Sequence, residues 1–227
     1  MMDFDTLLEK LVTTFDDDHV KMAMARIMLS GKPETRIRDV LHSHLFETEA
    51  IRPFSEWSGT VNGQNINRVD LAVHSHINGV PNGLQGLVEF KAWMGIDVYD
   101  QYRWDRGQLP KELGNSIIGQ FDKDAAKLRQ ARVADHQTPW LAICTLLYYV
   151  RPNNPELIPY LKYPGVIRED LDADHTMVEM CNTFVANLEG LVGELEPPVT
   201  IHDPTILMSV EDVLGHDVAL AAIWCKV

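Results

Sequence analysis

Three charged residues interrupt two segments that otherwise have the composition of buried β-strands. Asp70 lies in INRVDLAV, residues 66–73, whereas Glu89 and Lys91 lie one residue apart in LVEFKAW, residues 87–93. Charged side chains are seldom buried unless they are paired or bind a metal. These residues therefore either face water or form a site.

Strand geometry predicts that the three side chains share one face of a sheet. Alternate residues of a strand point to the same side, so Asp70, Glu89 and Lys91 converge if the two segments are neighbours joined by the turn at 78–83. The opposite face is expected to enter the core through Leu71, Val73, Val88, Phe90 and Ala92.

The residue types point to metal-assisted chemistry on a phosphate. Two carboxylates on neighbouring strands repel each other, and a hard cation such as Mg²⁺ relieves that repulsion by accepting oxygen ligands from both. Such a cation polarises a phosphoryl oxygen and acidifies a bound water. The ammonium of Lys91 is expected to orient or help deprotonate that water and to stabilise the phosphate charge. Glu34 begins the apolar stripe of a predicted helix and is a candidate further ligand, directly or through water.

Simpler interpretations exist for each of these residues. Glu89 and Lys91 would also suit an exposed cross-strand ion pair, and the helix dipole favours an acid such as Glu34 in a first turn whatever its neighbours. His74 and His76 form an HxH pair on the strand of Asp70, yet no third zinc ligand follows from the spacing, so solvated histidines are favoured.

The remaining pattern predicts helices on both sides of a strand-rich centre. Asn-Gly and Gly-rich turns separate the central strands, and the continuous apolar run PWLAICTLLYYV is typical of a strand buried on both faces. The stretch 99–114 mixes aromatic and charged residues and is expected to be an irregular, exposed connection. Its interleaved aromatic and basic residues would either contact nucleic acid or hold the loop against the protein by packing of their rings (Tyr99, Tyr102, Arg103, Trp104, Arg106). We expect helices at about 3–15, 16–29, 33–46, 115–133 and 174–195, and strands at about 54–61, 64–77, 84–94, 139–150 and 216–227. This order predicts an α/β fold with a central mixed β-sheet flanked by helices.

RVDLAV followed by LVEFKAW resembles the PD-(D/E)XK nuclease superfamily, which has the restriction-endonuclease-like fold. In the mapping, Asp70 matches the motif's Asp, Glu89 and Lys91 match its ExK, and Val69 replaces its Pro. The resemblance covers about residues 33–150 and implies that Asp70, Glu89 and Glu34 bind Mg²⁺, with Mn²⁺ as a substitute. It also implies a supporting role for Gln120, on the helix after the ExK strand. It further implies DNA as the substrate and a homodimer, because cutting two strands needs two sites.

Composition sets further expectations. The 227 residues are expected to form one domain, with the nuclease-like core at about 33–150, a helical extension at 1–32 and an acidic part at 151–227 that completes the sheet. Three widely spaced cysteines, no signal-peptide pattern and no long apolar run favour a cytoplasmic protein that does not enter membranes. The net charge of −13 is concentrated in residues 151–217, which hold three Lys/Arg against thirteen Asp/Glu, so the rest of the chain is nearly neutral.

The expected function is therefore a Mg²⁺-dependent endonuclease-type phosphodiesterase acting on DNA. One alternative is a catalytically inactive binding or regulatory protein on the same fold, such as an acidic partner or a DNA mimic, which the overall charge favours. A second alternative is a metal-dependent enzyme that acts on a small substrate through the face of His74 and His76. The intact trio of Asp70, Glu89 and Lys91 argues against the first, and the lack of a third ligand argues against the second.

Overall fold

A computed structural model describes residues 4–31, 33–46, 51–61, 64–78, 80–105, 116–130, 140–154, 156, 176–192 and 198–227. Its helices are α1 Phe4–Thr14, α2 Asp18–Ser30, α3 Glu34–Phe46, α4 Gly95–Tyr99, α5 Gln101–Trp104, α6 Ile117–Gln130 and α7 Met177–Val192. Its strands are β1 Ile51–Val61, β2 Gln64–Ile77, β3 Val80–Met94, β4 Trp140–Pro152, β5 Thr200–Ile201, β6 Thr205–Val210 and β7 His216–Lys226.

The strands of the described chain form one mixed sheet in the order β1-β2-β3-β4-β7-β5, and β6 also pairs with β7. Only β3 and β4 run parallel in this sheet, and the connection between them carries α4, α5 and α6. The other described pairings are antiparallel. The prediction of an α/β fold with a mixed sheet flanked by helices is confirmed.

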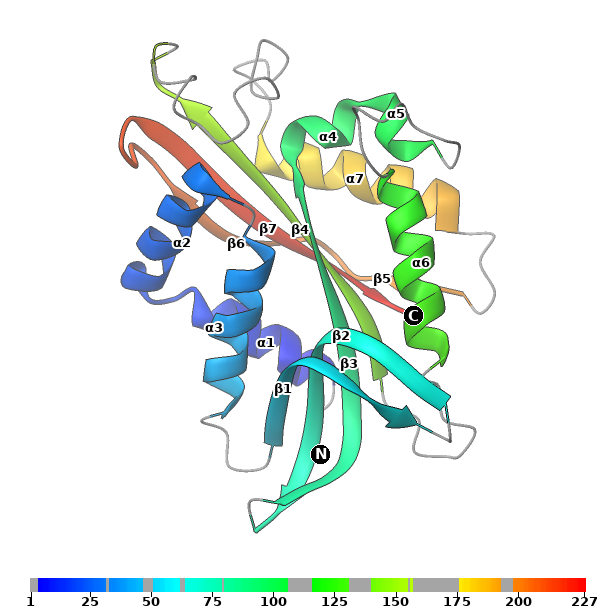
Figure 1. Ribbon diagram of the computed structural model, residues 1–227. Helices are drawn as coiled ribbons and strands as arrows, with labels where there is room; N and C mark the ends of the chain where they lie inside the picture. Colours follow the sequence, from blue (N-terminus) through cyan, green and yellow to red (C-terminus); the bar gives the residue numbers. More distant parts are fainter. Residues whose placement is uncertain are drawn as a thin grey trace.

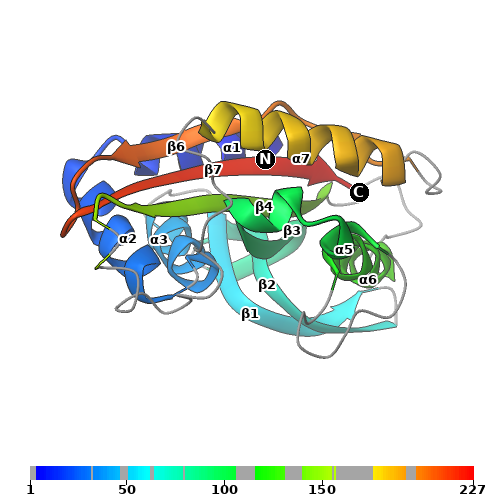
Figure 2. The same ribbon diagram turned by 90° about the horizontal axis from the view of Figure 1, so that it is seen from above.

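Helices cover both faces of the sheet (Figure 1). One apolar cluster lies between the sheet and α1–α3, and a second lies between the sheet and α4–α7. Seen from above, β1 and β2 curve away from the sheet centre toward α6 (Figure 2). This curvature brings strand residues close to a helix that follows them by some fifty positions.

Local sequence explains where the N-terminal helices begin. The side chain of Asp17 accepts a hydrogen bond of 2.7 Å from the backbone N–H of His19 and so caps α2. Pro33 directly precedes α3, where its missing N–H is harmless, and its carbonyl accepts from the N–H of Ile37. Glu34 is consequently the first residue of α3, at the end of the helix that approaches the sheet.

Two sequence-based expectations about connections were wrong. The stretch 99–114 was expected to be irregular, but its described part contains the end of α4 and all of α5. Trp104 is buried there, because its indole N–H donates to the carbonyl of Val98 at 2.9 Å and its ring packs on Phe184. The short strands β5 and β6 were also missed, since each is completed by pairing with β7 rather than by its own pattern.

Candidate active site

The candidate site lies where β2 departs from β3. Backbone pairing between these strands runs as far as Leu71 opposite Val88, so the next step along both strands places Asp70 opposite Glu89. At this step the carboxylate of Asp70 accepts a hydrogen bond of 2.8 Å from the backbone N–H of Phe90. A side chain thus satisfies a donor on the β2-facing edge of β3, and Asp70 is held at that edge.

Glu34 satisfies the next donor along the same edge. Its carboxylate accepts from the backbone N–H of Ala92 at 3.2 Å, so the first residue of α3 contacts β3 directly. Ala92 follows Phe90 by two residues, which separates the two donors by roughly 7 Å along an extended strand. Two carboxylates, from Asp70 and Glu34, therefore line consecutive positions of one strand edge.

Helix α6 contributes two charged residues from the other side. Asp124 forms an ion pair with Lys91, with 3.2 Å between the carboxylate oxygen and Nζ. Lys127, one turn further, forms an ion pair with Glu89 and donates a hydrogen bond of 3.0 Å to the backbone carbonyl of Arg68. These contacts connect α6 to both β2 and β3 across the site.

Burial and mutual repulsion perturb the acids. The side chain of Glu89 is only 3% exposed, and burial together with the negative charge of Asp70 raises the pKa of Glu89 to about 7 despite the ion pair with Lys127. Burial likewise raises the pKa of Asp124, although Lys91 opposes the shift. Asp70 also contributes to that rise, so the three carboxylates influence one another within one partly buried space.

Lys91 stays protonated in this environment. Burial lowers the pKa of Lys91, but the charges of Asp124, Glu89 and Asp70 outweigh burial, and the pKa lies above its ordinary value. The group is therefore an ammonium at neutral pH, able to donate hydrogen bonds and to stabilise negative charge.

The structure brings together most of the residues that the sequence singled out. Asp70, Glu89 and Lys91 interact electrostatically with one another, and Glu34 lies on the same edge of β3. Gln120 is half-buried on α6, and its spacing places it on the side of that helix that carries Asp124 and Lys127.

The sequence analysis missed Asp124 and Lys127. Asp124 is buried within the apolar stripe of α6, three residues after Phe121, and a carboxylate inside such a stripe was the available signal. Lys127 had no comparable signal, because its role depends on how α6 lies over β3. Both are now part of the candidate site.

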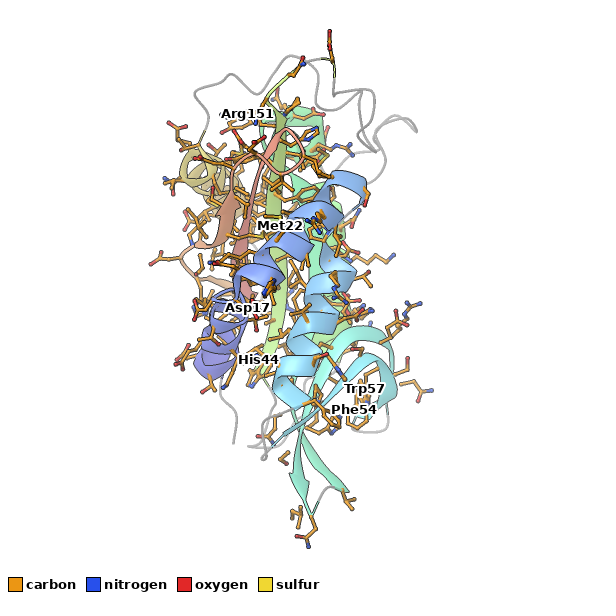
Figure 3. The ribbon with its side chains drawn as sticks, turned by 90° about the vertical axis from the view of Figure 1, so that its left-hand side faces the viewer. Asp17, Met22, His44, Phe54, Trp57 and Arg151 are labelled. Atoms are coloured by element: carbon orange, nitrogen blue, oxygen red, sulfur yellow. The ribbon has the colours of Figure 1, made fainter. Side chains whose placement is uncertain are left out.

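The described residues of the HxH pair and of the aromatic and basic stretch make contacts within the protein. His74 packs against the rings of Phe54 and Trp57, and burial lowers its pKa, whereas the side chain of His76 lies outside the described part. Figure 3 shows Phe54 and Trp57 together on β1. In the aromatic and basic stretch, Arg103 pairs with Asp97 at 3.1 Å. Arg106 and the side chain of Tyr102 lie outside the described residues.

The site residues fit a hard divalent cation bound largely by water and substrate. Within the described ranges, no group of three or more His, Cys, Asp or Glu side chains is arranged to hold a metal. Mg²⁺, however, is commonly held by one or two carboxylates, with waters and phosphate oxygens completing its shell. The repulsion between Asp70 and Glu89, which helps raise the pKa of Glu89, is the feature that such a cation would relieve.

Comparisons of the chain with protein families, with curated proteins and with solved structures gave no match. In the described part of the chain, each helix is too short or too polar to cross a lipid bilayer.

Proposed function

We propose that this protein is a Mg²⁺-dependent phosphodiesterase that hydrolyses DNA on a restriction-endonuclease-like fold. The observation that carries the proposal is the meeting of Asp70, Glu89 and Lys91 where β2 departs from β3, with Glu89 buried and its pKa raised to about 7. A structural ion pair needs one acid and one base. Here at least three acids share the space, an arrangement that a divalent cation stabilises.

Asp70 and Glu89 would hold the cation, and Glu34 would contribute through water. The backbone N–H of Phe90 fixes the Asp70 carboxylate, and that of Ala92 fixes Glu34, so both acids are oriented before any ligand arrives. Such preorganisation avoids a rearrangement during reaction. When bound, the cation would supply Lewis-acid polarisation of a phosphoryl oxygen and a more acidic water.

Lys91 is assigned to charge stabilisation rather than to proton abstraction. Its raised pKa keeps it protonated, so it donates hydrogen bonds to the attacking water or to a phosphate oxygen. Asp124 positions the ammonium through the ion pair of 3.2 Å, and Gln120, one turn before Asp124, supports the same side of the site. The acids Asp70 and Glu89 would thus bind the cation, whereas the ammonium of Lys91 would contact the phosphate or the attacking water.

The order of elements supports the fold assignment. Helix α3 with Glu34 precedes β2 with Asp70, then β3 with Glu89 and Lys91, then α6 and β4, which is the order of the superfamily that the sequence resembles. DNA as the polymer follows from that resemblance. The homodimer and the cytoplasmic location stay predictions.

The test is hydrolysis of supercoiled plasmid, single-stranded DNA and RNA by the purified chain, with Mg²⁺, Mn²⁺ or EDTA. We expect DNA cleavage that needs the divalent ion and falls about 100-fold or more in Asp70→Asn and Lys91→Ala. Lys226→Ala, an exposed lysine of β7, is the control and should cleave like the unsubstituted protein. Cleavage that survives both site substitutions, or that persists in EDTA, would contradict the proposal.

A second candidate is an inactive nuclease-fold protein that binds a partner. The ion pairs Lys127–Glu89 and Lys91–Asp124 neutralise much of the site internally, and the chain carries a net charge of −13. The same assay separates the two candidates, since a binding protein cleaves none of the three polymers with either metal.

A further inference from the structure

Lys127 forms an ion pair with Glu89, the acid that we assign to the proposed cation. Its ammonium pairs with Oε1 of Glu89, and it donates a hydrogen bond of 3.0 Å to the backbone carbonyl of Arg68. Its side chain is 24% exposed, whereas that of Glu89 is 3% exposed. The acid is thus fixed in the sheet, while the lysine reaches it from α6 and stays partly exposed.

Lys127 and a divalent cation would contact the same carboxylate. When ionised, Glu34, Asp70, Glu89 and Asp124 contribute four negative charges, and Lys91 and Lys127 contribute two positive charges. The resulting net negative charge favours binding of a cation, but the ammonium of Lys127 already contacts one of the acids assigned to that cation. The competition is therefore for Glu89 itself.

Lys127 is better placed to leave than Lys91. The partner of Lys91 is Asp124, an acid that we do not assign to the cation, so this ion pair persists when a cation binds. The acidic partner of Lys127 is Glu89 itself, and a carboxylate oxygen cannot contact an ammonium and a divalent ion at full strength together. The second contact of Lys127, the Arg68 carbonyl, is neutral and holds it less firmly.

We propose that Lys127 is an internal competitor for the cation site: it holds Glu89 in the cation-free protein and withdraws when a divalent ion binds. This inference rests on the proposed function, because it takes Glu89 to be a cation ligand. It describes regulation of the same site, in which the lysine lowers the affinity for the ion and stabilises the buried acid when no ion is present.

The test measures binding of Mn²⁺ to the full chain without substrate. Electron paramagnetic resonance gives the concentration of free Mn²⁺, from which the bound fraction follows. Lys127→Met removes the charge and keeps an unbranched apolar chain, and Lys127→Gln is a second, polar replacement. Lys123→Ala removes an exposed lysine from the same helix and is the matched control. Glu89→Gln removes the shared acid.

We expect Lys127→Met and Lys127→Gln to bind Mn²⁺ about tenfold more tightly or better, because like charges a few ångströms apart repel even where water screens them. Lys123→Ala should bind like the unsubstituted protein, and the gain from Lys127→Met should vanish when combined with Glu89→Gln. Unchanged or weaker binding by both Lys127 variants, while Glu89→Gln alone weakens binding, would overturn the competition and leave the proposed function standing. Absence of Mn²⁺ binding by every form would overturn both.

Discussion

The two faces of β3 differ in chemistry although the same fifteen residues form both. Toward α1–α3, the strand presents Val88, Phe90 and Ala92, which are almost fully buried in an apolar cluster. Toward α6 it presents Glu89 and Lys91, which are held by ion pairs. The apolar face is packed in the core, which fixes the position of the strand backbone. The charged groups on the other face are attached to the same backbone, so their positions are fixed as well.

The edge of β3 shows the same division along its length. Up to Val88 the backbone pairs with β2, and beyond that point the carboxylates of Asp70 and Glu34 accept its N–H groups. The change from strand partner to side-chain partner marks the position of the candidate site.

The largest effect is expected on the apolar face. Phe90→Ala should lower the free energy of unfolding by about 3–5 kcal/mol, since it removes a fully buried ring and leaves a cavity. Urea denaturation measures the change. Lys91→Met on the opposite face is the comparison and should lower the free energy of unfolding far less. An equal loss in both variants would show that the two faces do not differ as described.

Two substitutions of Asp70 distinguish the contribution of its hydrogen bond to stability from the contribution of its charge to catalysis. Asp70→Ala leaves the N–H of Phe90 without its acceptor and should destabilise the protein by about 2 kcal/mol. Asp70→Asn keeps an acceptor oxygen, so it should lower the free energy of unfolding, measured by urea denaturation, less than Asp70→Ala does. It should nevertheless abolish Mg²⁺-dependent cleavage. Equal stability of the two variants would show that the hydrogen bond contributes little.

The buried charge of Glu89 should make stability depend on pH in the absence of divalent ions. The pKa of Glu89 is about 7 in the folded protein and near its ordinary value of 4.5 when unfolded, so ionisation in the folded state opposes folding. The penalty is absent below about pH 4.5 and fully present above about pH 7.

Glu89→Gln mimics the neutral acid and removes that penalty. The free energy of unfolding of Glu89→Gln, relative to that of the unsubstituted protein, should therefore rise by about 3 kcal/mol between pH 4.5 and pH 8. Urea denaturation in EDTA at several pH values measures this difference, and Glu9→Gln, an exposed acid of α1, is the control. A difference that does not change with pH would contradict the buried charge.

The smallest effect is expected where charges pair in water. Arg68 is largely exposed and contacts the exposed Glu56 at 2.5 Å, so Arg68→Ala should leave the urea midpoint unchanged. Arg38 is buried and contacts the same carboxylate at 3.0 Å, so Arg38→Ala should lower the midpoint clearly. A reversed order would show that exposure does not determine the contribution of these pairs.

The faces of β2 and β3 could be predicted from sequence because strand periodicity depends only on local order. Val88 and Phe90 indeed enter one apolar cluster, and Glu89 and Lys91 lie on the other face. The convergence with Asp70 was also predictable, since the turn between the strands is short.

The contribution of α6 could not be predicted in the same way. Gln120 lies on the same helix as Asp124 and Lys127, but the pairing of Asp124 with Lys91 depends on the crossing of that helix over the sheet, which no local pattern encodes. The edge contacts of Glu34 and Asp70 depend on where β2 departs from β3. Local order predicted the elements and their faces, whereas contacts between distant elements required the structure.

The central claim is that Asp70 and Glu89 share a divalent cation. Crystals of the protein soaked in Mn²⁺ test it most directly, because the anomalous signal of the ion locates it without reference to activity. We predict one strong peak within coordination distance of a carboxylate oxygen of both residues, with Lys127 withdrawn from Glu89. A peak elsewhere, or none at this position while the ion pair between Lys127 and Glu89 persists, would contradict the claim.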